Sequence, residues 1–168
     1  MKSFERLVLA HLKDITGPLL DPLQFALPTG QTVQFNTIIS DILHSKLSQL
    51  TVPAPTCQWI SKFLADRRQQ VRLGSITSST RTISTGAPQG CVLSPLLFSL
   101  YTNDCTSGDP NVKLLKFADH KTVIGLIQDG DESAYRREVE HLAVWCSGQN
   151  NLELNTGSGS WVPQSPRT

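Results

Sequence analysis

The feature that most constrains the fold is an apolar helix directly after a flexible loop. The loop is Thr85-Gly86-Ala87-Pro88-Gln89-Gly90, whose glycines and proline permit sharp changes of backbone direction. Ser94 and Pro95 are residue types typical of a helix start, so Ser94 is predicted as the N-cap and Pro95 as the first helical residue. The helix that continues to Tyr101 has no polar face, and such a helix is buried. Other elements must therefore surround it.

Helices and a ribbon are predicted before this loop. Apolar residues at helical spacing predict an amphipathic helix over 4–15, a second over 38–50 and a third that follows 53–56 and contains Trp59 and Leu64. The Pro- and Gly-rich stretch 18–30 has no period and is interpreted as a connector. Polar and β-branched residues over 70–83, with a turn at Gly74-Ser75, predict a two-stranded ribbon.

A β-hairpin and a last helix are predicted after the apolar helix. Two short apolar strands, 112–118 and 122–127, flank Asp119-His120-Lys121, which places a carboxylate at the tip of the hairpin. Asp131 then precedes a helix that Gly148 is placed to end. Three aromatic residues at helical spacing are expected to pack in the core rather than to stack on bases, namely Trp59, Phe63 and Trp145.

Composition limits the class of protein. With 168 residues, of which 39% are apolar, the chain can form one domain or part of a larger one. Its formal net charge of +1 gives no strong global positive field, so any nucleic-acid binding must use a local patch. The four cysteines lie far apart, with no zinc-site spacing, and no signal peptide or membrane-spanning run is present. We therefore expect an intracellular protein, in the nucleus or cytoplasm, with free thiols and no membrane contact.

Three blocks together resemble the reverse transcriptase domain of non-LTR (LINE-type) retrotransposons, in particular the fish-type enzymes. The block 84–98 is similar to the family's G-x-P-Q-G-x-x-x-S-P motif, and Lys116-Phe117-Ala118-Asp119 resembles the start of its F/Y-A-D-D hairpin. The run from Trp59 to Leu73 and the segment ending at Ser147 resemble flanking elements of the same domain. The likeness covers most of 1–25 and 35–156.

The resemblance implies Mg²⁺-dependent nucleotide addition, with Asp119 as catalytic residue and metal ligand. The family binds its metal ions with three aspartates, two of them adjacent at the hairpin tip, because two Mg²⁺ ions must be bridged by carboxylates. Here His120 follows Asp119, and imidazole is a poor ligand for hard Mg²⁺. The remaining aspartate would fall at Gly30, before the surviving Phe35-Asn36-Thr37-Ile38. Two of three expected carboxylates are therefore absent, and activity near background is expected.

The resemblance also implies other site residues and partners. Gly86, Pro88, Gln89 and Gly90 would abut the template and the nucleotide. Arginines of the third helix and the ribbon could contact phosphates or could simply be solubilising, namely Arg67, Arg68, Arg72 and Arg81. The implied partners are an RNA template, a DNA primer and nucleotide triphosphates, and the sequence sets no oligomeric state.

The fold implied is α+β, a partial polymerase palm with a small antiparallel sheet, helices on one face, truncated fingers and no thumb. Residues 1–25 would be a fingers-proximal helix and connector, 26–37 a junction where the first catalytic strand motif is lost, 38–156 the partial palm and 157–168 a disordered tail. The missing strand would leave a sheet edge unpaired.

Other functions stay open beside the polymerase. The chain could be a non-catalytic remnant that still binds nucleic acid, or a retroelement-derived polypeptide without function. A hydrolase that pairs Asp119 with His120 is a third possibility, but no nucleophile elbow or metal cluster accompanies the pair.

Overall fold

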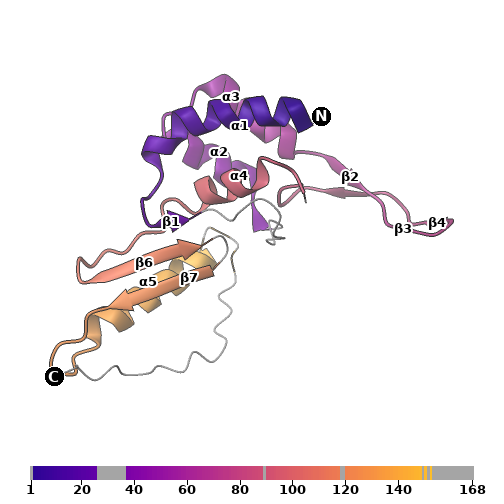
Figure 1. Ribbon diagram of the computed structural model, residues 1–168. Coiled ribbons are helices and arrows are strands. Elements are labelled where there is room, and N and C mark those ends of the chain that lie inside the picture. The colour runs from indigo at the N-terminus through magenta and orange to yellow at the C-terminus, as the bar shows by residue number, and fades with distance from the viewer. Residues whose placement is uncertain are drawn as a thin grey trace.

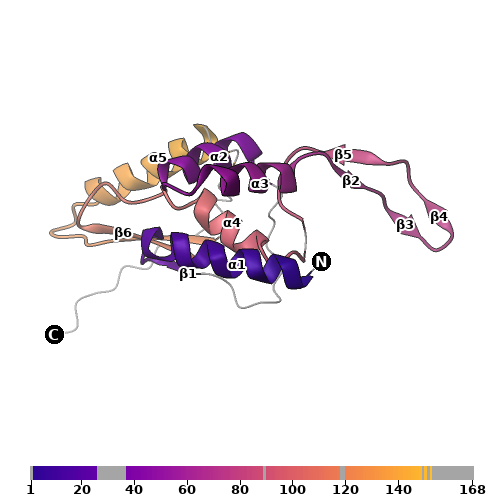
Figure 2. The ribbon, with the colours of Figure 1, turned by 90° about the horizontal axis from the view of Figure 1, so that it is seen from above.

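The computed structural model describes residues 2–25, 37–88, 90–117, 120–148, 150 and 152. Its helices are α1 (Lys2–Thr16), α2 (Ser40–Gln49), α3 (Ala54–Leu64), α4 (Ser94–Tyr101) and α5 (Ser133–Gly148), and the 3-10 turn η1 (Gly17–Leu19) follows α1. The helices α1 to α4 lie together, α5 packs against a small sheet, and a two-stranded ribbon projects from the body (Figures 1 and 2). The described part of the chain is a mixed α+β fold, as predicted.

The apolar helix α4 is buried, as its sequence requires. Every residue from Leu96 to Tyr101 is buried, and Ser94 is buried as well. The prediction that Ser94 is the N-cap is wrong. Leu93 precedes the helix with backbone angles that are already helical, so Ser94 lies inside the first turn. The Ser94 hydroxyl instead donates to the carbonyl oxygen of Pro88 at 2.7 Å, which ties the preceding loop to the helix.

The predicted hairpin is present and forms most of a three-stranded sheet. β6 (Val112–Phe117) pairs antiparallel with β7 (His120–Gly125), from Val112 opposite Gly125 to Phe117 opposite His120. His120 and Lys121 therefore belong to the second strand rather than to the turn, because cross-strand pairing continues to them. The side chains of β6 alternate between a buried face and an exposed face, and α5 packs on the buried face.

The stretch predicted as a connector contributes a strand. β1 (Gln24–Phe25) pairs parallel with the end of β6, with Gln24 opposite Lys116 and Phe25 opposite Phe117. The sheet order is β1-β6-β7, so the sheet is mixed and not purely antiparallel. β1 covers the edge of β6 only at Lys116 and Phe117. The strand expected before Phe35 falls outside the described residues, so the unpaired edge that its loss would leave stays a prediction. A two-residue strand has no period of its own, so pairing with β6 decides its conformation.

The ribbon between α3 and α4 is confirmed and is longer than predicted. At its base β2 (Arg67–Gln69) pairs antiparallel with β5 (Arg81–Ile83), and at its tip β3 (Arg72–Leu73) pairs with β4 (Ile76–Thr77). Gly74 in the tip turn has φ +60°, a conformation that favours glycine. The ribbon extends away from the helices in two perpendicular views (Figures 1 and 2).

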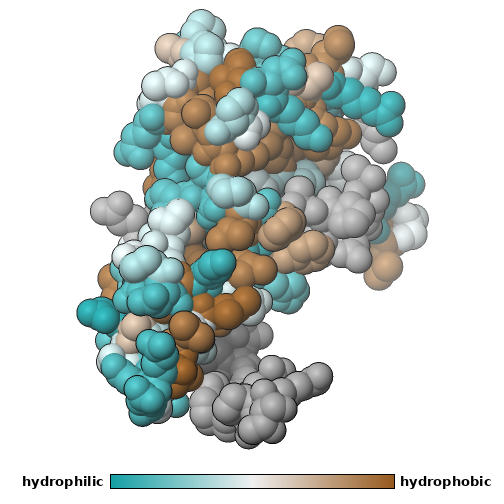
Figure 3. Space-filling view, turned by 60° about the vertical axis from the view of Figure 1, so that its left-hand side comes forward, coloured by the Kyte–Doolittle hydropathy of each residue, from teal (hydrophilic) through white to brown (hydrophobic). Residues whose placement is uncertain are grey.

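Two clusters of buried apolar side chains stabilise the body. The larger lies among α1 to α4, and the smaller lies between α5 and the hairpin and contains Cys105, Leu114, Leu142 and Cys146. As predicted, Trp59 and Phe63 pack against the larger cluster and Trp145 against the smaller. Hydrophobic residues also reach the surface of the molecule, as Figure 3 shows. Phe117 and Ile124 are exposed on the same face of the sheet.

The buried Lys116 and the partly buried Lys46 join these parts near the C-terminal end of α4. The Lys116 ammonium forms an ion pair with Asp21 at 2.9 Å and donates to the carbonyl oxygens of Thr102, Asn103 and Cys105. The Lys46 ammonium donates to the carbonyl oxygen of Tyr101 at 2.7 Å and pairs with Asp104. Burial lowers the pKa of Lys46, although its hydrogen bond to Asp104 opposes the shift. Cations are favoured at this end of a helix, where carbonyl groups lack partners and the dipole is negative.

Candidate nucleotide- and template-facing loop

The loop from Thr85 to Val92 contains most of the sequence motif that carries the family resemblance. Gly86 and Gly90 have φ +75° and +72°, so both need the left-handed conformation that glycine adopts without strain. The Gly86 amide donates to the carbonyl oxygen of Ile38 at 2.6 Å, which fixes the loop against the start of α2. Pro88 lies in the same turn, while Gln89 lies outside the described residues.

Arg67 holds the loop from the base of the ribbon. Its Nη2 donates to the carbonyl oxygens of Thr85 at 2.5 Å and of Gly86 at 2.6 Å, and its Nε donates to that of Leu64 at 3.1 Å. Burial lowers the pKa of Arg67. The structure thus places this guanidinium in contacts within the protein, whereas Arg68 and Arg72 are exposed on the ribbon. Contact with nucleic-acid phosphates stays a prediction for the exposed pair.

Glu5 holds the other side of the loop and was not found by sequence reasoning. Its carboxylate accepts from the Val92 amide at 3.2 Å and from the Cys91 thiol at 3.3 Å. Glu5 is buried although it lies in an otherwise amphipathic helix. Burial raises the pKa of Cys91, and the Glu5 carboxylate acts in the same direction. No local sequence pattern predicts this contact, because Glu5 and Cys91 are 86 residues apart in the chain.

Replacing Arg67 with alanine should loosen this loop without unfolding the protein. The substitution removes hydrogen bonds to carbonyl groups, one of them on the buried Gly86, and we expect a loss of about 1 to 3 kcal/mol in the free energy of unfolding. The measurement is urea unfolding together with hydrogen exchange of the Gly86 amide. Arg68→Ala removes the same charge from an exposed neighbour and should change stability by less than about 0.5 kcal/mol. Equal effects of the two substitutions would contradict the role of Arg67.

The hairpin tip, where the metal ligand was predicted, is described only on its two sides. Phe117 and His120 face each other across the strands, and Asp119 lies outside the described residues, as does Gly30. In the described part of the chain, no three His, Cys, Asp or Glu side chains lie close enough to hold a metal ion. Those residues therefore form no three-ligand metal site by themselves.

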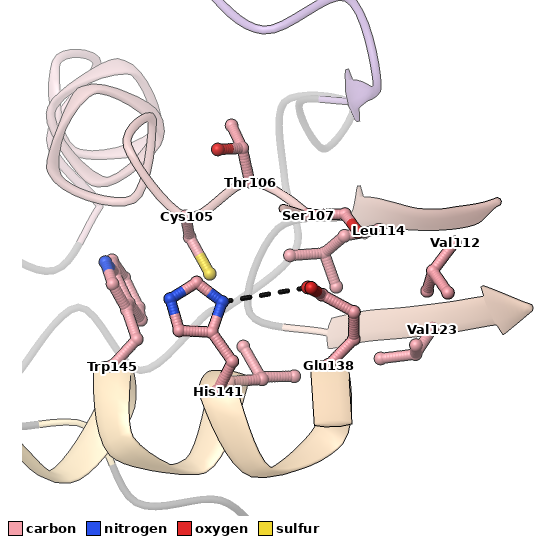
Figure 4. Close-up of a pocket in the computed structure, with 10 residues that line it drawn as sticks. Cys105, Thr106, Ser107, Val112, Leu114, Val123, Glu138, His141 and Trp145 are labelled. Atoms are coloured by element: carbon pink, nitrogen blue, oxygen red, sulfur yellow. Dashed lines mark ion pairs between the residues drawn. The ribbon is translucent and has the colours of Figure 1, made fainter. Parts of the chain in front are cut away.

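A small pocket lies between α5 and the hairpin, and none of the residues that line it was predicted for the site. Figure 4 shows it lined by apolar strand residues with Glu138 and His141 of α5 at one side, 3.7 Å apart between Oε2 and Nδ1. Its volume of about 10 Å³ is roughly the room that one water molecule needs. Burial raises the pKa of the Cys105 thiol to about 11, so this cysteine is protonated and unreactive at neutral pH.

The raised pKa of Cys105 predicts a loss of stability at high pH. The folded state favours the neutral thiol, so between pH 9 and 11 the unfolded chain loses its proton first and unfolding becomes more favourable. We expect the contribution of Cys105 to fall by on the order of 2 kcal/mol over this window. Urea unfolding from pH 8 to pH 11 measures this fall in the free energy of unfolding for the wild type and for Cys105→Ala. The difference between the two proteins isolates Cys105, because every other titratable group is present in both. Parallel stability curves for the two proteins would refute the prediction.

Comparison with known proteins identifies the family. The model of the family described as reverse transcriptase (RNA-dependent DNA polymerase) matches residues 1–157. This chain therefore belongs to the reverse transcriptase family. It is 35% identical over 121 residues to the probable RNA-directed DNA polymerase from transposon BS of Drosophila melanogaster, which covers 67% of this chain and 13% of that protein. It is also 35% identical over 102 residues to the probable RNA-directed DNA polymerase from transposon X-element of the same fly, and this alignment covers 61% of this chain and 10% of that protein.

The chain spans only about an eighth or a tenth of the length of these relatives. It is a reverse transcriptase domain homologous to RNA-directed DNA polymerases of transposons. Among its described helices, none has the length and apolar character needed to cross a bilayer.

Proposed function

We propose that this chain is a retrotransposon-derived reverse transcriptase segment whose RNA-directed DNA polymerase activity is near background. The observation that carries the proposal is the dipeptide Asp119-His120, in which an imidazole stands where the family resemblance calls for a second aspartate. Gly30 stands where the first aspartate is expected. One carboxylate cannot bridge two Mg²⁺ ions, and each ~1.4 kcal/mol of lost transition-state stabilisation lowers the rate about tenfold.

The same proposal assigns parts of the chain to regions of the polymerase domain and names the group of retrotransposons from which the chain derives. Residues 38–156 correspond to a partial palm, 1–25 to a fingers-proximal segment and 26–37 to the junction where a catalytic strand motif is lost. The lineage is that of the fish-type LINE enzymes, and the ancestral substrates are an RNA template, a DNA primer and nucleotide triphosphates. Gly86, Pro88, Gln89 and Gly90 form the ancestral template and nucleotide contact. The positive φ of both glycines and the contacts from Arg67 and Glu5 support a loop held in one shape.

Primer extension tests the proposal. The purified chain is given a DNA primer on an RNA template, with Mg²⁺ and then with Mn²⁺, beside Asp119→Ala. We expect equal, background extension by both proteins, because the two-metal site is incomplete without further carboxylates. Circular dichroism establishes that both are folded. Extension by the wild type that disappears in Asp119→Ala would show that another carboxylate completes the site, and the proposal would be wrong.

A second candidate function is nucleic-acid binding without catalysis, and the distribution of charge favours it. Between Arg67 and Asn103 the chain has four arginines and no acidic residue. The whole chain has 15 basic and 14 acidic residues, so 11 basic and 14 acidic residues remain elsewhere, a net charge of −3. The small total charge therefore conceals a positive segment on a negative body.

A further inference from the structure

The positive segment coincides with the element that projects from the body. All four of its arginines lie on β2, β3 and β5 of the ribbon, which extends away from the helices (Figure 2). Three of them, Arg68, Arg72 and Arg81, are exposed, and within the described residues none of the three forms an ion pair. The Arg72 Nε donates to the carbonyl oxygen of Gly74 at 3.1 Å, which uses one of its five N–H groups. With no carboxylate paired to these three guanidinium groups in the described part of the chain, their charge is available to a polyanion.

The pairing of the strands sorts the ribbon into two faces. Residues directly opposite each other share a face, so Arg68 lies beside Thr82 and Arg72 beside Thr77. Gln70, between the two arginines in the sequence, donates to the Thr80 hydroxyl at 2.6 Å. Because side chains alternate along an extended chain, Arg68, Gln70 and Arg72 share one polar face. Leu73 and Ile76 pair on the opposite face at the tip.

We propose that this polar face, formed by Arg68, Gln70 and Arg72 with the threonines opposite them, binds the sugar-phosphate backbone of an RNA–DNA hybrid duplex. Guanidinium groups pair with phosphate oxygens, and hydroxyl and amide groups add further donors. Arg68 in β2 and Arg72 in β3 are four residues apart, and Val71 and Gln70 between the strands contact Ser78 and Thr80 of the opposite side, so an extended chain separates the two arginines by about 13 Å. That span is comparable with four phosphate spacings of ~3.4 Å along the axis of a duplex, so both arginines can contact the same backbone.

The composition of the ribbon favours a duplex over a single strand held by base stacking. No aromatic residue occurs between Leu64 and Leu97. Proteins that hold single strands without sequence preference stack the bases on aromatic side chains, and this ribbon offers none. Backbone contacts alone carry no sequence information. Binding should therefore depend on salt and should be equal for hybrids of different sequence.

The inference rests on the second function proposed above, and its test separates the two. Fluorescence anisotropy of the full chain with a labelled RNA–DNA hybrid gives the dissociation constant at several salt concentrations. The ribbon variant is Arg68→Ala/Arg72→Ala. The matched control is Arg136→Ala/Arg137→Ala, which removes two exposed arginines from α5 and so changes the net charge equally. Urea unfolding of each variant establishes that it is folded.

We expect the ribbon variant to reduce the slope of log affinity against log salt by about two, since each lost phosphate contact removes close to one unit. The control should leave the slope unchanged, and Arg68→Lys/Arg72→Lys should retain it. If the ribbon variant and the control had equal dissociation constants and equal salt slopes, the ribbon would not be the binding site. Nucleic-acid binding by another part of the chain would still be possible in that case. Tighter, ribbon-dependent binding of single-stranded RNA would overturn the choice of duplex. Absence of binding by the wild type would overturn the binding function itself.

Discussion

Replacing Lys116 with methionine should lower the free energy of unfolding by roughly 3 to 5 kcal/mol, because it leaves a charge without its partner in the interior. The Lys116 side chain is 1% exposed, and its ammonium is the cation opposite Asp21, which is 14% exposed. Methionine has a similar length but cannot donate, so three carbonyl oxygens at the end of α4 also lose a hydrogen bond.

Urea unfolding followed by tryptophan fluorescence measures this loss, and the same strand supplies the control. Lys113 lies on the exposed face of β6, so Lys113→Met should change stability by less than about 0.5 kcal/mol. Because the cost of Lys116→Met comes from a stranded carboxylate, adding Asp21→Asn should cost less than the sum of the two single changes. If Lys116→Met and Lys113→Met were equally mild, the buried ion pair would not stabilise the fold.

Replacing Leu97 with alanine should lower the free energy of unfolding by about 3 to 4 kcal/mol, because the substitution removes a fully buried side chain from the centre of the core. Leu97 is fully buried among the side chains of the larger apolar cluster, which α1 to α4 share. Large-to-small substitutions at such positions lose the transfer free energy and leave a cavity, at a cost of about 2 to 5 kcal/mol. The effect should appear as a lower urea midpoint with an unchanged slope.

Two further substitutions distinguish lost packing from other effects. Leu73→Ala removes the same atoms from a side chain that is 80% exposed at the tip of the ribbon, and it should be nearly neutral. Leu97→Met keeps the volume and should cost less than about 1.5 kcal/mol. If Leu97→Met were as damaging as Leu97→Ala, the side-chain volume at this position would not explain the loss.

Periodicity in the sequence predicted the elements that depend on neighbouring residues. The amphipathic pattern over 4–15 became α1, and the all-apolar run before Tyr101 became the buried helix α4. The hairpin of β6 and β7 followed from two apolar runs, although the exact strand ends did not. The motif around Gly86 also predicted membership of the reverse transcriptase family, and the family match over residues 1–157 confirms this.

The buried ion pair of Lys116 left a signal in the sequence from which more could have been predicted. The alternation along β6 puts Lys116 on the same face as Val112 and Leu114, which predicts a buried lysine and hence a buried acidic partner. Its identity could not be predicted, because Asp21 lies 95 residues earlier in a stretch without a period.

The sequence by itself determined the helices, the ribbon and the hairpin, which helix is buried and which family motifs are present, because each of these depends on residues within a few turns of one another. It also determined that histidine follows Asp119. Only the tertiary structure decided that Gln24–Phe25 is a strand, that Glu5 and Arg67 hold the loop, and that Lys116 is an interior cation rather than a surface one. The physical reason is that burial and partnership are properties of contacts between distant segments. A charged residue has the same letter whether it is solvated or paired in the core.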